Sequence, residues 1–192
     1  MLDNQPTQTE QIDNNDKKSS DNAFVRFFKD YTGVLILCCV TILMCRFVFS
    51  LHKIPSSSME PTIKTESFAV AWRLPYLFGD PTPNFGDIIT FKDPDTGLML
   101  IKRVIGLPGD QIVIADGKVS RNGVELDEPY IARQGSTFAP NSVYDVPEGC
   151  VFVLGDNREH SRDSRFKETT YIPIHSLFSK ELFSIYAPAI FV

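Results

Sequence analysis

The chain has 192 residues, of which 43% are hydrophobic and 22% are charged, and its formal net charge is −5. This length suits one domain, or one domain with a small insert, and the composition is sufficient for a packed core. The acidic balance, without any clustered basic stripe, argues against a nucleic-acid partner.

Four cysteines and three histidines are too scattered to suggest a metal or disulfide site. Cys38, Cys39 and Cys45 lie in one apolar run, and Cys150 has no other cysteine in its own domain. A disulfide within that domain is therefore excluded, and none of the spacings is typical of zinc ligands. We expect no metal and no cofactor.

The first part of the chain is predicted to be a disordered tail followed by a membrane anchor. Residues 1–22 are polar and nearly free of large apolar side chains, so they cannot bury enough surface to offset their ordering entropy. Residues 33–51 carry a single charge, Arg46, and we place the anchor at 23–51 with its span at about 30–50. A cleaved signal peptide is the competing interpretation, but about thirty residues precede the run and no small-x-small cleavage pattern follows it.

The charges around the apolar run predict its orientation. Only Lys53 and Lys64 follow the run closely once Arg46 is treated as interfacial. Four basic residues precede it, namely Lys17, Lys18, Arg26 and Lys29. By the positive-inside tendency the tail is cytoplasmic, and residues 52–192 form an extracytoplasmic domain.

Beyond the anchor the pattern is that of β-strands. Short apolar runs bounded by Gly, Pro or Asp predict strands at 67–72, 87–92, 98–105 and 150–154. Asp116-Gly117 and Asn122-Gly123 are preferred hairpin turns, so residues 112–126 are predicted to form a three-stranded meander. Residues 127–149 are rich in loop signals, and no useful helical period follows the apolar run. The predicted fold is mainly β: an antiparallel sheet domain at 52–192 with a small β insert at about 109–149, after one transmembrane helix.

Three consecutive hydroxyls lie between two prolines directly after the apolar run. Ser56, Ser57 and Ser58 stand between Pro55 and Pro61, and proline restricts both its own φ and the residue before it. A stiff segment of this kind suits a nucleophile that is held in one geometry. On these residues alone, a polar linker that leaves a membrane helix is an equal alternative.

Lys102 lies among apolar residues of the predicted strand 98–105. It either reaches outward to solvent or is buried, and burial would disfavour the ammonium and lower its pKa. A neutral lysine amine can take a proton from serine, and Ser–Lys pairs replace Ser-His-Asp in some hydrolases. The stretch 155–165, which has no apolar side chain, alternates acids and arginines. It suits either a solvated loop or a rigid polar shell in which Ser161 or His160 could orient a base.

Taken in order, these stretches resemble the motifs of type I signal peptidases, a Ser/Lys serine protease family. The matching sequences are IPSSSMEPT at 54–62, GDIITF at 86–91, KRVIGLPGD at 102–110 and GDNREHSRDSR at 155–165. The resemblance covers about residues 46–165. Glu159-His160 replaces the more usual Asp-Asn, and Phe166 is not followed by the aromatic residue and glycine usual in the family. The conformation after Arg165 is therefore not predicted.

The resemblance implies a role for each matching position. Ser58 would be the nucleophile and Lys102 the general base, while the Ser56 hydroxyl and the Ser58 N–H would form the oxyanion hole. Ser161 would hydrogen-bond Lys102 and orient it. Structural support would come from the pairs Arg103–Asp156 and Asp163–Arg165. Shallow pockets for small side chains at the first and third positions before the scissile bond would be lined by Ile54, Pro55, Met59, Ile63, Leu100 and Ile101.

The resemblance thus implies a membrane-bound serine endopeptidase that cleaves N-terminal signal peptides at the outer face of a bacterial plasma membrane. Preproteins and the lipid bilayer would be its partners. A specialised maturation peptidase for a pilin or conjugation protein would carry the same motifs. A catalytically silent, membrane-tethered scaffold is a second alternative, although the presence of both Ser58 and Lys102 disfavours it. A LexA-like self-cleaving switch shares the dyad, but the anchor and the absence of a predicted DNA-binding helix pair argue against it.

Overall fold

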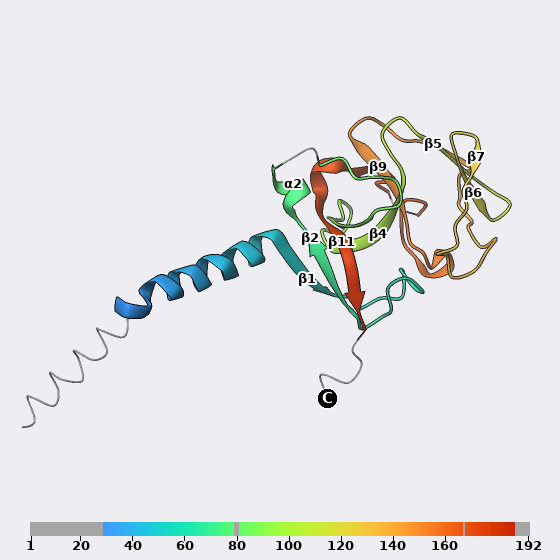
Figure 1. Cartoon of the computed structure of the whole chain (residues 1–192). Helices are drawn as coiled ribbons and strands as arrows, with labels where there is room; N and C mark the ends of the chain where they lie inside the picture. Colours follow the sequence, from blue (N-terminus) through green and yellow to red (C-terminus); the bar gives the residue numbers. More distant parts are fainter. Residues whose placement is uncertain (1–28, 79–80, 167, 187–192) are drawn as a thin grey trace, which may run out of the picture. The chain divides into compact units, whose positions relative to one another are not determined.

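The computed structural model describes residues 29–78, 81–166 and 168–186 (Figure 1). The predicted tail at 1–22 lies outside these residues. The chain divides into two compact units, Met1–Arg46 and Phe47–Val192.

The described residues before the sheets form one apolar helix. It spans Lys29–Val48, and its 20 residues are long and apolar enough to cross a membrane. The helix ends two residues before the predicted end of the span, because Phe49 already pairs with Trp72 in an antiparallel ladder. Backbone pairing to a neighbouring strand therefore sets this boundary, and apolarity alone does not mark it.

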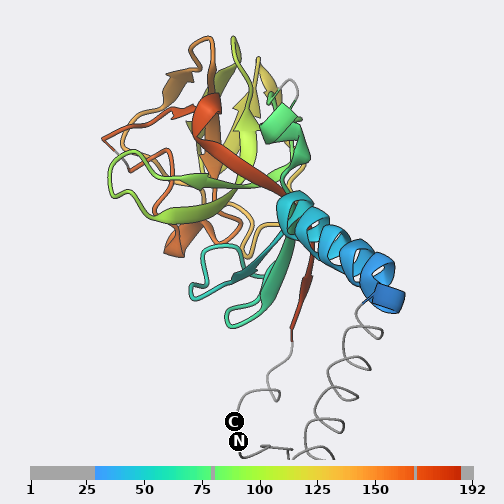
Figure 2. The same cartoon turned by 90° about the vertical axis from the view of Figure 1, so that its left-hand side faces the viewer.

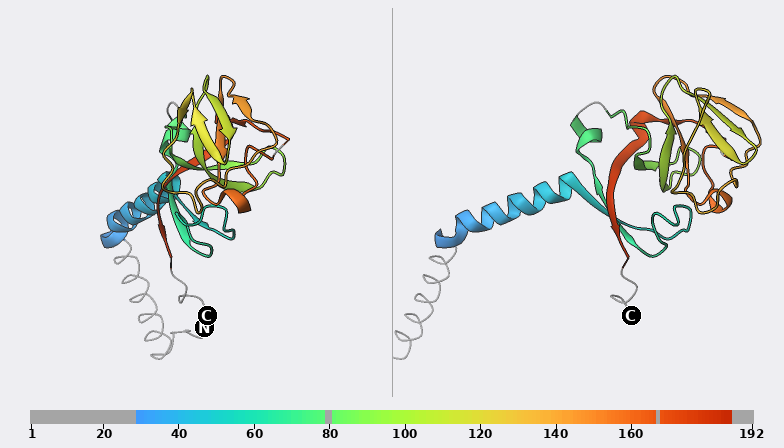
Figure 3. Two further views of the ribbon diagram at one scale, coloured as in Figure 1. Left: turned by 90° about the vertical axis from the view of Figure 1, so that its right-hand side faces the viewer. Right: turned by 45° about the vertical axis from the view of Figure 1, so that its right-hand side comes forward.

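The second unit is built on antiparallel β-sheets, as predicted (Figures 1 and 3). Among the described residues, one sheet has seven strands in the order β1-β2-β11-β3-β4-β9-β10, and the other has four in the order β7-β6-β5-β8. The larger sheet consists of β1 (Phe49–Lys53), β2 (Phe68–Trp72), β3 (Ile88–Lys92), β4 (Met99–Gly106), β9 (Cys150–Leu154), β10 (Ile172–Pro173) and β11 (Leu177–Ile185). The smaller sheet consists of β5 (Gln111–Ala115), β6 (Lys118–Arg121), β7 (Val124–Glu125) and β8 (Val143–Asp145). The helices of this unit are short: α2 (Leu74–Phe78), η1 (Arg158–His160) and η2 (Ile174–Ser176).

The strands expected from apolar runs are all present. The four predicted single strands correspond to β2, β3, β4 and β9, and the meander corresponds to β5, β6 and β7. Asp116 and Gly117 have φ of 50° and 79°, and Asn122 and Gly123 have φ of 52° and 80°. Both hairpin turns therefore have the left-handed central residues that their sequences predicted.

Four strands were not predicted, and β11 is the longest of them. It lies between β2 and β3 in the larger sheet, and Figure 3 shows it beside β2. Its register shifts twice, between Leu177 and Ser179 and between Glu181 and Phe183. Each shift interrupts the alternation of inward and outward side chains, so the strand has no clear period of two. The strands β1, β8 and β10 were missed as well.

Buried apolar side chains form three clusters that position the site. The first lies on one face of β3, β4 and β9 and includes Phe91, Val104 and Val153. The second lies between β4, β9 and the smaller sheet and includes Ile112 and Phe152. The third joins the segment between β1 and β2 to the larger sheet through Ile54, Met59, Ile63, Ala69 and Ile101. Figure 2 shows this segment as the loop that connects the two teal strands.

Candidate active site

The segment that carries the three serines connects β1 to β2 and is fastened at both ends. The Ile54 N–H donates to the Ser67 carbonyl at 2.9 Å, and the Glu66 N–H donates to the Ile54 carbonyl at 2.8 Å. Within the segment the Ile63 N–H donates to the Met59 carbonyl at 2.9 Å, and the Met59 side chain is fully buried. The apolar residues of the segment thus hold it against the sheet and fix the position of the preceding serine.

Ser58 and Lys102 meet beneath this segment. Lys102 Nζ donates to Ser58 Oγ at 2.8 Å, and the two residues are only 3% and 6% exposed, respectively. Nζ also donates to the Ile101 carbonyl at 2.8 Å. Strand β4, which carries Lys102, lies between β3 and β9 in the larger sheet, and the Lys102 side chain is buried on one face of it. This contact is close enough for proton transfer between the hydroxyl and a neutral amine.

The two predicted oxyanion donors are the hydroxyl of Ser56, which is exposed, and the backbone N–H of Ser58, which is buried. Ser56 is exposed, and its Oγ lies 3.4 Å from Ser58 Oγ, at the long end of hydrogen bonding. The Ser58 N–H is not donated to any acceptor within the described part of the chain. It is therefore available to a substrate oxygen.

The predicted hydrogen bond from Ser161 to Lys102 is absent. Ser161 Oγ is buried, and no residue of the described chain hydrogen-bonds it. The hydroxyl lies against Gly155, where an added Cβ would be only 2.2 Å away, and the Ile101 carbonyl binds the Lys102 amine instead. The prediction of a Ser161–Lys102 bond was therefore wrong for this conformation. His160 is exposed, and its Nδ1 lies 3.2 Å from Asn157 Oδ1.

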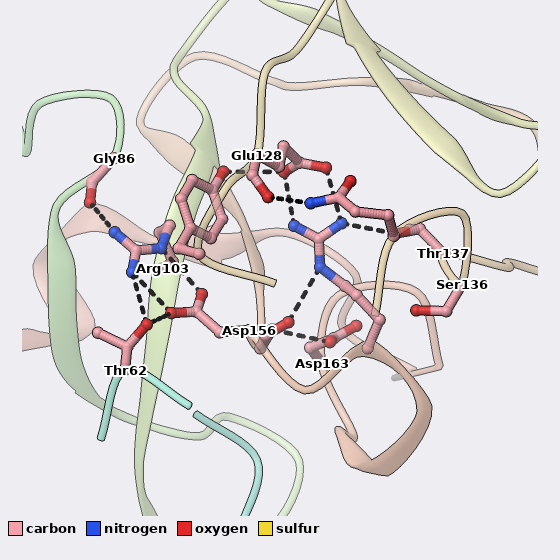
Figure 4. Close-up of polar contacts among 12 residues, drawn as sticks. Thr62, Gly86, Arg103, Glu128, Ser136, Thr137, Asp156 and Asp163 are labelled. Atoms are coloured by element: carbon pink, nitrogen blue, oxygen red, sulfur yellow. Dashed lines mark hydrogen bonds and ion pairs between the residues drawn. The ribbon is translucent and has the colours of Figure 1, made fainter. Parts of the chain in front are cut away.

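The predicted pair of Arg103 and Asp156 is a bidentate ion pair (Figure 4). Arg103 Nε donates to Oδ1 at 2.8 Å and Nη2 donates to Oδ2 at 2.6 Å, while Asp156 is fully buried. Burial opposes the charge of Arg103, but the hydrogen bonds and the negative charge of Asp156 raise its pKa. Thr62, which follows the serines, donates its hydroxyl to Asp156 Oδ2 at 2.5 Å. The ion pair thus fastens the segment that carries the three serines to β4 through a threonine that sequence reasoning had not assigned.

A second buried ion pair lies beside the first and was not predicted. Arg158 donates to the two Glu128 oxygens at 2.6 and 3.0 Å, and to Thr137 Oγ1 at 2.7 Å. Tyr130 donates its hydroxyl to Glu128 at 2.8 Å, while its ring lies 4.0 Å from the Arg103 guanidinium carbon. Burial and the charge of Glu128 raise the pKa of Tyr130. Figure 4 shows this chain of contacts between the loop after β7 and the loop after β9. In the sequence, the acidic residues and the tyrosine at 127–130 were the available signal for this ion pair. Glu128 and its partner Arg158 are, however, 30 residues apart.

The predicted pair of Asp163 and Arg165 is also formed. Arg165 Nε donates to Oδ1 at 2.8 Å and Nη2 donates to Oδ2 at 2.9 Å, with both residues buried. Asp163 Oδ2 in turn accepts the Gly155 N–H at 3.0 Å. The pair therefore holds the loop that begins at the end of β9.

The residues predicted to line the substrate pockets separate into groups. Four of them, Ile54, Met59, Ile63 and Ile101, gather in the third apolar cluster, which joins the segment that carries the serines to β4. Pro55 is exposed. Leu100 packs instead against the first cluster, because neighbouring residues of a strand point to opposite faces of the sheet. The structure thus does not place Leu100 with the other lining candidates.

Within the described ranges, no group of three His, Cys, Asp or Glu residues is arranged to hold a metal ion. The described cysteines are all free thiols, and Cys150 is half-buried in β9.

Comparison with known proteins gives consistent matches. A family model described as "Signal peptidase, peptidase S26" matches residues 26–186. The chain is 35% identical to the probable signal peptidase I-1 of Synechocystis sp. over 170 residues, which cover 84% of each chain. It is 39% identical to the signal peptidase I of Bacillus caldolyticus over 142 residues, which cover 66% of this chain and 75% of that one. A crystal structure of a signal peptidase I from Enterococcus faecalis V583 is 34% identical, covers 51% of this chain and 95% of its own, and has a TM-score of 0.44. On the strength of the sequence matches, this chain belongs to the signal peptidase family, peptidase S26.

Proposed function

We propose that Ser58 and Lys102 form the catalytic dyad of a membrane-anchored endopeptidase that cleaves signal peptides from preproteins. The observation that carries the proposal is the 2.8 Å contact between the two buried side chains. The family match supports the same activity, because its model and relatives are signal peptidases. A silent scaffold has no need of a buried amine, which is costly to desolvate.

The chemistry follows from the surroundings of the amine. Burial favours the neutral form of Lys102, because removing an ammonium from water is unfavourable. In that form Nζ accepts the Ser58 proton as Oγ attacks the scissile carbonyl carbon. The resulting ammonium then protonates the departing amine, which leaves an ester between Ser58 and the signal peptide. A water molecule attacks that ester with Lys102 again as the base, and the serine is released.

The developing oxyanion would be stabilised by the Ser58 N–H and the Ser56 hydroxyl. The N–H has no acceptor among the described residues, and Ser56 Oγ lies 3.4 Å from the nucleophile. Each donor of this kind is worth about 3 kcal/mol of transition-state stabilisation. Arg103–Asp156 and Asp163–Arg165 act as structural supports, since they hold the two loops that flank Ser58.

Substrate selection is assigned to the third apolar cluster. Ile54, Met59, Ile63 and Ile101 pack closely together in the buried cluster beneath the segment that carries Ser58. We assign to this cluster the selection of small side chains at the first and third positions before the scissile bond. We include the exposed Pro55 beside this cluster, whereas Leu100 packs against the first cluster.

We assign residues 52–192 to an extracytoplasmic catalytic domain, with a small insert at about 109–149, at a bacterial plasma membrane. The basic residues before the apolar helix favour a cytoplasmic N-terminus. One face of β1, β2 and β11 supports contact with lipid, because the register places exposed apolar side chains together on it. These side chains are Phe49, Leu51, Trp72, Phe183 and Ile185.

The test is preprotein cleavage by the purified full chain in detergent micelles. Ser58→Ala and Lys102→Ala should each abolish cleavage while circular dichroism and the melting temperature show a folded protein. Lys118→Ala is the matched control, because it removes a lysine that forms an exposed ion pair with Glu125 on the smaller sheet. Full cleavage by either dyad variant would refute the proposed mechanism, and absence of cleavage by the wild type would favour the scaffold.

A further inference from the structure

We propose that Asn157 is a positioning residue that fixes the peptide groups on both sides of Ser58 and so aims the Ser58 N–H at the oxyanion. The inference rests on the proposed function, since it concerns the oxyanion hole of the same dyad. Asn157 follows β9 and Asp156, and it has no role in the dyad or in the supporting ion pairs.

Two hydrogen bonds join Asn157 to the nucleophile segment. Its side-chain Nδ2 donates to the Ser57 carbonyl at 3.1 Å. Its backbone N–H donates to the Ser58 carbonyl, also at 3.1 Å. One residue thus binds the carbonyls of both Ser57 and Ser58, which belong to the two peptide groups on either side of the Ser58 Cα.

The direction of the Ser58 N–H follows from the orientation of the Ser57 carbonyl, which accepts Asn157 Nδ2 and the Glu60 N–H, both at 3.1 Å. The peptide between Ser57 and Ser58 is trans, and the carbonyl and N–H of a trans peptide point in opposite directions. Because the Ser57 carbonyl points at Asn157, the Ser58 N–H must point away from Asn157. That N–H meets no acceptor within the described residues, as expected of a donor reserved for substrate. Rotation of this peptide would turn the donor away and present a carbonyl in its place.

The position of Asn157 is itself well fixed. Its carbonyl accepts the His160 N–H at 3.0 Å, which closes the turn at the start of η1. The preceding Asp156 is fully buried and held by Arg103. The Ser58 carbonyl also lies against Gly155, where an added Cβ would be 2.5 Å from its oxygen. Asn157 therefore projects from a rigid loop, which is what a positioning residue requires.

The test compares Asn157→Ala and Asn157→Asp with the wild type in preprotein cleavage by the full chain. Both variants lose the Nδ2 donor, and the aspartate also places an acceptor against the Ser57 carbonyl. We expect kcat to fall by about 10- to 100-fold, because an oxyanion donor is misdirected, while KM stays within about twofold. The pH profile of kcat/KM should keep its shape, because the contacts of Lys102 are unchanged.

Gln134→Ala is the matched control. Gln134 Nε2 donates to the Glu128 carbonyl at 2.8 Å, so the control removes the same type of partly buried amide-to-carbonyl bond away from Ser58. It should keep wild-type kcat even if its melting temperature falls as much as that of Asn157→Ala. An equal loss of kcat in the control, or a kcat for Asn157→Ala within about threefold of wild type, would overturn the inference.

Two further measurements separate this inference from the proposed function. If Ser58→Ala and Lys102→Ala are inactive but Asn157→Ala is fully active, the dyad stands and only the role of Asn157 fails. If the dyad variants cleave normally, the proposed function fails first and the inference falls with it. In a double-mutant cycle, Ser56→Ala and Asn157→Ala should lose less together than the product of their single losses, because both act on one oxyanion. Strictly multiplicative losses would contradict a shared oxyanion hole.

Discussion

A methyl group at Gly155 would collide with Ser161 and with the backbone of Ser58. An added Cβ would lie 2.2 Å from Ser161 Oγ, 2.5 Å from Ser161 Cβ and 2.5 Å from the Ser58 carbonyl oxygen. The Ser161 hydroxyl has no hydrogen bond and can rotate away. The other two contacts are relieved only if the backbone moves, and ordinary contact requires a displacement of about 1 Å.

The magnitude of the effect follows from that displacement. A misplacement of about 1 Å at a reacting group costs roughly 100-fold in rate, and overpacking costs about 1–3 kcal/mol of stability. We therefore expect Gly155→Ala to lower kcat/KM for preprotein cleavage by about 100-fold. The melting temperature should fall by several degrees, and the protein should remain folded at the assay temperature.

Gly106→Ala is the control for a general loss of stability. Its added Cβ would meet Val146, Ile112 and Phe152 side chains at 2.9–3.0 Å, so it overpacks the second cluster and leaves Ser58 untouched. This variant should be destabilised to a similar degree but should retain kcat. Wild-type cleavage by Gly155→Ala would refute the reasoning, and so would an equally inactive Gly106→Ala.

Three other predictions concern stability and membrane contact. Burial raises the pKa of Glu181 from its ordinary 4.5 to about 7. The folded state then binds a proton that the unfolded state has released, so the unfolding free energy should fall by up to roughly 3 kcal/mol as pH rises from about 4.5 to above 7. Urea unfolding at pH 5 and pH 8.5 measures this, and Glu181→Gln should flatten the difference; an unchanged difference would rule out Glu181 as its source. Glu128→Gln leaves the buried Arg158 without its carboxylate and should cost about 3 kcal/mol in the same unfolding assay, whereas a loss below about 1 kcal/mol would contradict the importance of that pair. In a vesicle co-sedimentation assay of the full chain, Leu51→Ser together with Ile185→Ser should weaken binding to lipid vesicles. Unchanged binding would argue against lipid contact at this face.

Much of the fold could be predicted from short stretches of sequence. The hairpins at Asp116-Gly117 and Asn122-Gly123 were found because their turn chemistry is local. The strand β11 was missed because two register shifts interrupt its alternation. Its place between β2 and β3 depends on backbone pairing with strands that are distant in sequence.

The candidate site shows the same division. Ser58 and Lys102 were selected from their motifs, as were the ion pairs Arg103–Asp156 and Asp163–Arg165. The expected bond between Ser161 and Lys102 failed, since a side-chain rotation and a neighbouring glycine decide where that hydroxyl lies. Neither detail is visible in a motif.

The sequence by itself determined the apolar helix and most of the strands and selected Ser58 and Lys102 as the proposed pair, because hydrophobicity, turn preference and motif chemistry belong to neighbouring residues. Only the tertiary structure decided that the hydroxyl and the amine lie 2.8 Å apart, since they are 44 residues apart in the chain. It also brought Asn157 against Ser57 across 100 residues. Such contacts depend on how the strands are ordered in the sheet, and strand order is a property of the whole folded chain.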